Sequence, residues 1–142
     1  MLLQAGGAGD LVINDNITSD TGNITLDAAN QLNIGAASGT PVLVQTGGTG
    51  SIVAEAAAAD VVMQPDATLQ TASGSIHVQA ATDVTVGRIV TNSDVAITAL
   101  AGSITDSDTN DTTTDISANG LRLSAAGSIG DLAGNGLSLI HI

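Results

Sequence analysis

One short tag recurs along this 142-residue chain: a glycine, then a small polar residue, then isoleucine. It recurs at sequence intervals of 28, 24, 28 and 25, as Gly22-Asn23-Ile24, Gly50-Ser51-Ile52, Gly74-Ser75-Ile76, Gly102-Ser103-Ile104 and Gly127-Ser128-Ile129. Repetition at this spacing is typical of chains built from stacked units, none of which buries its apolar face alone. The repeat therefore constrains the fold more than any other feature of the sequence.

A second tag, in which apolar residues alternate after a polar or glycine residue, lies between copies of the first. It occurs at residues 31–34, 60–63, 83–86, 94–97 and 120–123. Alternation over a few residues, bounded by Gly, Asn, Asp, Ser or Thr, predicts short β-strands. The alanine-rich stretch 55–59 is locally a good helix former, but it is too short to stand alone. We expect it to end a strand and begin a turn.

Stacking these units predicts an all-β fold, a parallel β-solenoid. We expect a right-handed β-helix of about five coils of 24–28 residues over residues 1–136, in which Ile24, Ile52, Ile76, Ile104 and Ile129 lie above one another. At the usual distance between strands, five coils form a rod of roughly 25 Å. The spacing permits either two or three strands per coil. Asn119-Gly120 is interpreted as the start of a strand rather than as a hairpin turn.

The last six residues, 137–142, have the sequence Leu-Ser-Leu-Ile-His-Ile. This string matches the in-frame translation of a common transposon-type sequencing adapter, so we interpret it as a scar. No cap for the rod is visible in the sequence, which favours a fragment cut from a longer array.

Composition excludes several classes of function. The chain has 2 basic and 14 acidic residues, a formal net charge of −12, no aromatic residue and no cysteine. Nucleic-acid binding is not expected without a basic footprint or stacking platforms. Disulfides and thiolate metal sites are impossible, and no apolar stretch is long enough to insert into a membrane.

Three runs carry a resemblance to a known group of proteins: those starting at Gly22 (Gly-Asn-Ile-Thr-Leu-Asp-Ala-Ala), at Gly74 (Gly-Ser-Ile-His-Val-Gln-Ala-Ala) and at Leu121 (Leu-Arg-Leu-Ser-Ala-Ala-Gly-Ser-Ile-Gly). They resemble the β-strand repeats of filamentous-haemagglutinin-like and autotransporter-like bacterial adhesin passengers. The resemblance implies an exported, non-enzymatic stalk at the bacterial cell surface, associated with the outer membrane through flanking domains. Its expected partners are neighbouring coils of the same parent chain and a host or surface ligand.

The acidic stretch 106–115 is the candidate metal site. Oxygen-bearing side chains at short intervals suit calcium, and the candidate ligands are Asp106, Asp108, Asn110, Asp111 and Asp115. The stretch is not an EF-hand, because position six is Asp111 rather than Gly and position twelve is Ser117 rather than Glu. A solvated loop between two strands is the alternative, with no cofactor at all.

Other acidic and glycine-rich positions have simpler interpretations. Asp10, Asp60, Asp83 and Asp94 precede strand tags and suit turns, although a stacked ligand ladder is an alternative. The glycine-rich pieces 6–10 and 47–52 fit turns better than calcium-binding repeats.

A glycan-processing β-helix enzyme is a remote alternative. Asp106, Asp108, Asp111 and Asp115 could meet on one face, but the chain has no Lys, Tyr or Trp to bind sugars. His77 is expected to point outward from a strand, and Arg88 and Arg122 to lie on different repeats.

Overall fold

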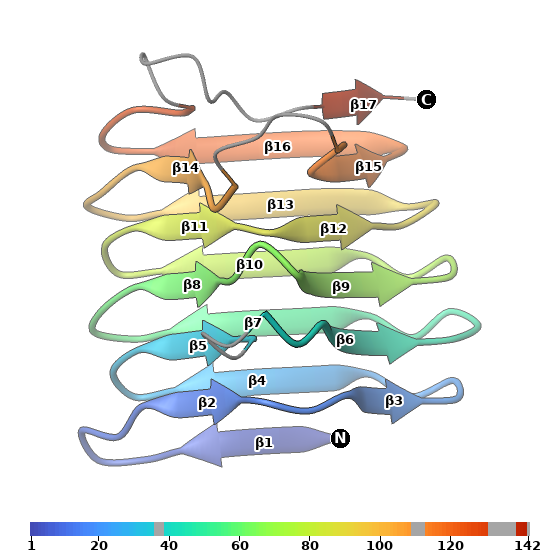
Figure 1. Cartoon of the computed structure of the whole chain (residues 1–142), viewed down its shortest axis with the longest axis horizontal. Coiled ribbons are helices and arrows are strands. Elements are labelled where there is room, and N and C mark those ends of the chain that lie inside the picture. The colour runs from blue at the N-terminus through green and yellow to red at the C-terminus, as the bar shows by residue number, and fades with distance from the viewer. Residues whose placement is uncertain (36–38, 109–112, 131–138, 142) are drawn as a thin grey trace.

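The alternating segments form a parallel β-solenoid with three strands per coil (Figure 1). The computed structural model describes residues 1–35, 39–108, 113–130 and 139–141. Three parallel sheets run along the rod, and the described residues contain no helix. Ascending from the N-terminus in Figure 1, the chain runs leftward along the rear sheet and rightward along the two front sheets, so the coil is right-handed. The expected all-β solenoid is therefore confirmed, with three rather than two strands per coil.

Each sheet collects strands from successive coils, six in sheets A and C and five in sheet B. Sheet A contains β1 (Leu2–Ala5), β4 (Ile24–Ala28), β7 (Ile52–Ala56), β10 (Ile76–Ala80), β13 (Asp94–Ala99) and β16 (Gly120–Ala125). Sheet B contains β2 (Leu11–Ile13), β5 (Leu32–Ile34), β8 (Val61–Met63), β11 (Val84–Val86) and β14 (Ile104–Asp106). Sheet C contains β3 (Ile17–Ser19), β6 (Val42–Thr46), β9 (Ala67–Thr71), β12 (Arg88–Val90), β15 (Ile116–Ala118) and β17 (Leu139–His141).

Two local expectations from the sequence are confirmed. The stretch 55–59 ends β7 and enters a turn, and Gly120 begins β16 instead of forming a hairpin. The segment interpreted as an adapter scar includes β17, which pairs with β15, while residues 137, 138 and 142 lie outside the described residues. The origin of that segment stays a prediction.

The coils differ in length more than the tags suggested. One outward-facing column of sheet A is formed, coil by coil, by Leu2, Thr25, Val53, His77, Ala96 and Arg122. The coil from Thr25 to Val53 is the longest of these, and the coil from His77 to Ala96 is much the shortest. The expected range of coil lengths was therefore too narrow. The single residue Gly87 that joins β11 to β12, together with the short strand β12, contributes to the shortness of the coil from His77.

The predicted isoleucine ladder is correct for three coils and wrong beyond them. Ile24, Ile52 and Ile76 are in register in sheet A. Ile76 is then followed by Val95, because the short coil returns the chain to sheet A early. Ile104 pairs instead with Val84 in sheet B, and Ile129 bridges to Ile104. The Gly-Ser-Ile tag therefore changes sheets after the fourth coil.

The core consists of the inward-facing side chains of all three sheets. Most long strands alternate buried and half-buried residues, as the period-two pattern predicts. Isoleucine, leucine, valine, alanine and one methionine, Met63, fill the interior. Because equivalent residues of successive coils pack on one another, removing a large core side chain leaves a cavity and costs about 2–5 kcal/mol.

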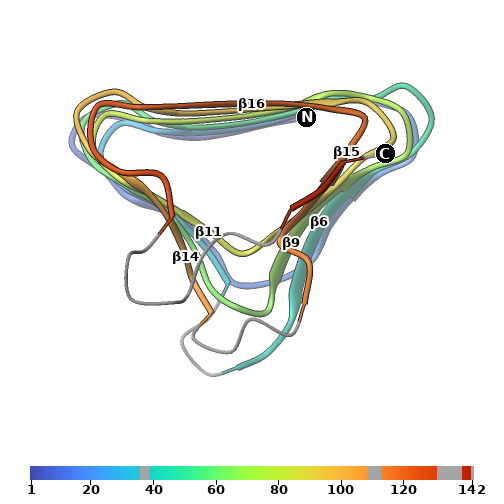
Figure 2. The ribbon, with the colours of Figure 1, turned by 90° about the horizontal axis from the view of Figure 1, so that it is seen from above.

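The three corners of the triangular cross-section are not equivalent (Figure 2). Connections from sheet A to sheet B contain 3 to 5 residues, and those from sheet C to sheet A contain 1 to 5. Connections from sheet B to sheet C contain 3, 7, 3, 1 and 9 residues in successive coils. Insertions in a solenoid that gather on one side often mark its binding face. The corner between sheets B and C is therefore the candidate site.

Candidate functional site

The corner between sheets B and C has two long connections on either side of two short ones. The long connections are residues 35–41 of the second coil and residues 107–115 of the fifth. Between them, residues 64–66 link β8 to β9, and Gly87 alone links β11 to β12. The chain thus takes its most direct path across this corner at the fourth coil.

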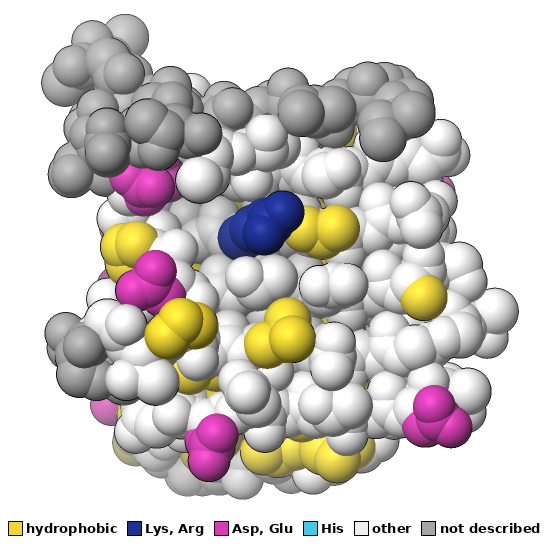
Figure 3. Space-filling view, turned by 45° about the vertical axis from the view of Figure 1, so that its right-hand side comes forward, with side chains coloured by type: hydrophobic (Ala, Val, Ile, Leu, Met, Phe, Trp, Pro, Cys, Tyr) yellow, Lys and Arg dark blue, Asp and Glu magenta, His cyan; other side chains and the backbone are white. Residues whose placement is uncertain are grey.

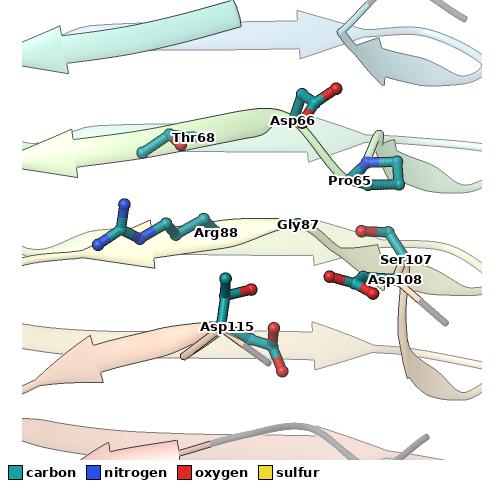
Figure 4. A pocket seen from close by; sticks show the side chains of 9 residues that line it. Pro65, Asp66, Thr68, Gly87, Arg88, Ser107, Asp108 and Asp115 are labelled. Carbon is teal, nitrogen blue, oxygen red and sulfur yellow. The ribbon is translucent and has the colours of Figure 1, made fainter. Parts of the chain in front are cut away.

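A hollow of about 210 Å³ lies at this place, and we call it the corner notch. Its lining residues come from the turn at 64–66, the two adjoining strands of sheet C and the fifth-coil loop: Pro65, Asp66, Thr68, Gly87, Arg88, Ser107, Asp108, Thr113 and Asp115. In Figure 4, Ser107 and Asp108 lie on one side of Gly87, and the Arg88 side chain extends to the other side.

Gly87 lines the notch, and no larger residue fits at this position. A Cβ atom at this position would lie 2.6 Å from the carbonyl oxygen of Gln64 and 2.7 Å from that of Ala67. It would also lie 3.2 Å from the Cβ of Met63. Glycine thus lets the fourth coil pass directly against the third, and the recess depends on this close approach.

Backbone hydrogen bonds hold both ends of the loop 107–115 against the fourth coil. The Ser107 amide donates to the Val86 carbonyl (2.9 Å), and the Ile89 amide donates to the Asp115 carbonyl (2.7 Å). Asp106 Oδ1 accepts from the Asp108 amide at 3.0 Å, which forms a local turn. Asp115 is only 4% exposed.

Two polar atoms in this region lack a hydrogen-bond partner. Asp106 Oδ2 and Ser107 Oγ are both buried and have no partner in the described structure. A buried acceptor without a donor is costly, so such atoms are uncommon in folded proteins. Two of the three buried side-chain atoms without a partner among the described residues therefore lie at this corner.

The predicted calcium ligands are brought together only in part. Asp108 and Asp115 both line the notch, and Asp106 lies just before it. Asn110 and Asp111 lie outside the described residues. Among the side chains that the structure describes, no group of three His, Cys, Asp or Glu residues is placed to hold a metal ion. With two of the five candidates undescribed, calcium binding here stays a prediction.

Sequence reasoning did not find the other half of the notch. Asp66, Thr68 and Arg88 are remote from the acidic loop in sequence, and the strand register brings them to it. The sequence predicted only that Arg88 lies on a different repeat from Arg122, which is correct, since β12 belongs to the fourth coil and β16 to the sixth. In Figure 3, basic side-chain atoms stand near the middle of the face shown, and the visible acidic side chains stand apart around them.

The aspartates that precede strand tags form hydrogen-bonded rungs rather than an empty ligand ladder. At the corner between sheets A and B, Asp10 Oδ1 accepts from the Gln31 amide (3.1 Å). In the same way, Asp60 Oδ1 accepts from the Asp83 amide (3.0 Å), and Asp83 Oδ1 accepts from the Ser103 amide (2.6 Å). Each carboxylate thus bonds to the backbone of the next coil, which supports the turn interpretation.

Asp94 does not belong to this column. It begins β13 and pairs with Gly120 at the corner between sheets C and A. The glycine-rich pieces lie at corners as expected, and Gly7 and Gly48 have φ angles of +72° and +56°. Left-handed backbone of this kind favours glycine, so turn geometry accounts for both pieces.

His77 takes the predicted outward position on sheet A, between Val53 and Ala96 of the adjacent strands. Its side chain is half-buried rather than fully exposed, and its Nε2 atom is buried without a partner among the described residues. No acidic residue occupies the same column on these two neighbouring strands. The position of His77 therefore indicates a packed surface residue rather than a ligand.

A second hollow, of about 270 Å³, lies at the corner between sheets C and A. Apart from Asp20, its lining is uncharged: Thr18, Ser19, Gln45, Thr46, Gly47, Gln70 and Ala72. It does not gather the oppositely charged groups that distinguish the corner notch.

The chain matches no protein-family model, no curated protein and no solved structure. The resemblance to bacterial adhesin passengers is thus a matter for proposal, and only the solenoid architecture is established. Within the described ranges, no helix is long and apolar enough to cross a membrane.

Proposed function

We propose that this chain is a structural and adhesive stalk segment of a large exported bacterial surface protein. The observation that carries the proposal is the combination of regularly stacked coils with length variation that is greatest at one corner. Regular coils give a solenoid that lengthens by simple addition of repeats, since each coil contacts only its neighbours. The variable corner then supplies contacts without disturbing the rod.

The surface chemistry supports this proposal. A formal net charge of −12 favours solubility and opposes non-specific attachment to anionic membranes or nucleic acid. The similarity of the repeats to those of filamentous-haemagglutinin-like and autotransporter-like passengers points to the same role. On this proposal the protein is extracellular and not an enzyme.

Sequencing the genomic DNA outward through both ends of the reading frame tests the stalk. We expect further Gly-Ser-Ile coils, together with an export signal and an outer-membrane secretion domain. A reading frame without additional coils or export sequences would contradict the proposal. Antibodies raised against this chain should label intact cells, and labelling only after lysis would contradict surface exposure.

Adhesion is tested separately with the chain itself. Beads coated with the chain should resist washing from a cell layer or abiotic surface better than albumin-coated beads. A matched control carries the chain with the exposed loop residues Thr40, Pro41 and Thr113 replaced by Gly or Ser. If unaltered and control beads detach alike, the variable corner is not the adhesive element.

A calcium-responsive module is the second candidate function. The buried, unpartnered Asp106 Oδ2 favours it, because a cation would satisfy an otherwise costly acceptor. Calcium should then raise the melting midpoint by several degrees, magnesium should do so less, and Asp108→Asn should abolish the effect. A passive stalk predicts the same melting curve with calcium, magnesium or chelator.

A further inference from the structure

We propose that the outer face of sheet A docks against the same face of a second copy of this chain, with the two rods side by side and antiparallel. This pairing surface lies beyond the proposed function, since a stalk does not need one. Three features of the face carry the proposal: its shape, the placement of its charges and the area that it offers.

Sheet A forms a flat side of the rod. Figure 2 shows it as a straight side of the triangle, opposite the corner between sheets B and C. Its six strands contain 4 to 6 residues each. Several of its outward side chains are short and uncharged, namely Thr25, Val53, Ala96, Thr98 and Ser124. A face of this kind can pack on another sheet about 10 Å away.

The charges of this face are separated along the rod. Asp27 and Glu55 are in register on β4 and β7, in the second and third coils, and Arg122 lies on β16, in the sixth. All three point outward from their strands, with the carboxylates half-buried and Arg122 exposed.

These charges are not neutralised within one copy. Among the described residues, neither Glu55 nor Arg122 has an ion-pair partner, and the side-chain hydrogen bond of Asp27 comes from the neutral Gln4 (2.7 Å). Carboxylates directly opposite each other on adjacent strands repel. The face therefore has an acidic pair that lacks a cation at one end and a guanidinium that lacks an anion at the other.

A two-fold axis parallel to the strands brings the opposite charges together. It runs the two rods in opposite directions, so the sixth coil of each copy can lie over the second and third coils of the other. Arg122 of one copy then faces Asp27 and Glu55 of the other, and the symmetry makes this contact twice. A two-fold axis along the rod would instead place acidic coils on acidic coils, so charge favours the antiparallel arrangement.

The net charge of −12 does not prevent this contact, because few of the carboxylates lie on the face. In the described structure, the acidic residues within the strands of sheet A are Asp27, Glu55 and Asp94, and Asp94 begins β13 at the corner. Repulsion between exposed charges is largely screened beyond about 8 Å at physiological ionic strength. The carboxylates of the other sheets are therefore mostly screened from a copy that lies against sheet A.

The area of the face sets the expected strength of pairing. Six strands about 4.8 Å apart, with about five residues that each rise about 3.3 Å, offer roughly 400 Å² per copy. Interfaces of this size are typical of weak and transient complexes. We therefore expect a reversible dimer, and every coil added to the stack would enlarge its interface.

Sedimentation velocity of the unaltered chain at physiological salt, over a wide range of concentrations, tests the pairing. We expect a reversible equilibrium between monomer and dimer, which Arg122→Glu should weaken about tenfold or more. Arg88→Glu is the matched control, because it changes the net charge equally at the other basic residue, on sheet C. It should stay within about twofold of the unaltered chain. Equal weakening by both variants, or a chain that is monomeric at every concentration, would overturn the proposal.

Exchanging the charges between two variants tests the specific contact. Asp27→Lys/Glu55→Lys should not pair with itself, because its lysines would face Arg122 of the other copy. Mixed with Arg122→Glu, it should recover dimers at least as stable as those of the unaltered chain, since both contacts then join opposite charges. A mixture that stays monomeric, although both variants keep the circular dichroism spectrum of the unaltered chain, would refute the contact.

Cross-linking tests the orientation, and the absence of cysteine from the chain makes it clean. In an oxidised mixture of Val53→Cys and Ala96→Cys, the antiparallel arrangement predicts disulfides mainly between the two different variants. Disulfides mainly between identical variants would mean parallel rods and would overturn the proposal. None of these outcomes bears on the stalk, which the flanking genomic sequence tests independently.

Discussion

The corner between sheets A and B and the corner between sheets B and C connect strands of similar length, yet they hold their coils together differently. The first has connections of 3 to 5 residues and a column of side chains, including Asp10, Asp60 and Asp83, that bond to the next coil. The second has connections of 1 to 9 residues, and its side-chain rung in the described structure is Asn16 Oδ1 accepting from Leu43 (2.8 Å).

The comparison shows where a solenoid can change its length. A rung requires the acceptor of one coil to lie directly below an amide of the next, so the number of residues entering the corner is constrained. Where such rungs are sparse, the chain can leave and return at little cost, because loop-closure entropy rises slowly with length. The notch forms where long and short connections adjoin.

The largest expected difference between the two corners comes from lengthening both of them equally. A Gly-Ser-Gly-Ser insertion between Thr82 and Asp83 should lower the free energy of unfolding by about 3 kcal/mol or more, because it displaces the Asp60–Asp83–Ser103 rungs. The same insertion between Gly39 and Thr40 should cost less than about 1 kcal/mol. Urea unfolding of the two proteins measures the difference, and equal losses would refute the distinction between the corners.

Replacing Gly87, the single-residue connection of the corner between sheets B and C, should sharpen the comparison of the two corners. Gly87→Ala places a methyl group against the carbonyl oxygens of Gln64 and Ala67, so we expect a loss of about 3 kcal/mol in unfolding free energy. Gly6→Ala, in the corner between sheets A and B, meets no atom within 4 Å and should change stability by less than about 1 kcal/mol. Similar urea midpoints for the two variants would show that the fourth coil does not depend on close packing at Gly87.

Removing one rung should have the smallest effect of the three. Asp83→Ala deletes the acceptor of the Ser103 amide, which should lower the free energy of unfolding by about 1 kcal/mol. Asp83→Asn keeps an acceptor and should recover part of the loss. Asp66→Ala, at the other corner, should stay within about 0.5 kcal/mol of the unaltered chain. A larger effect at Asp66 than at Asp83 would reverse the assignment of which corner holds the coils.

Much of the architecture follows from local sequence. Short alternating segments between turn residues predict strands, and their repetition predicts stacked coils. The sheet to which each Gly-Ser-Ile tag belongs could not be predicted, because the same sequence interval corresponds to two different structural steps. The step from Ile24 to Ile52 makes one coil, whereas the equally long step from Ile76 to Ile104 makes one coil and one further passage between sheets.

Only the side of the corner notch formed by the acidic loop could be predicted from the sequence. Asp108 and Asp115 stand in an acidic run that any scan for oxygen ligands finds. Asp66 and Arg88 join them through strand register and the shortness of the Gly87 connection, neither of which leaves a local pattern. The tag at 94–97 was a usable signal. It follows Gly74-Ser75-Ile76 too soon for a full-length coil, which indicates the short coil at the corner notch.

The rungs at the corners have a common direction. In each described bond between a backbone amide and a side chain of an adjacent coil, the acceptor belongs to the earlier coil and the amide to the later one, as in Asn23 to Ser51 and Ser103 to Ser128. A finished coil therefore presents preplaced acceptors to its successor but has no equivalent side-chain acceptor for its predecessor's amides. The stack therefore has a direction. Folding that proceeds from the N-terminus adds each new coil to a coil whose side-chain acceptors are already in place.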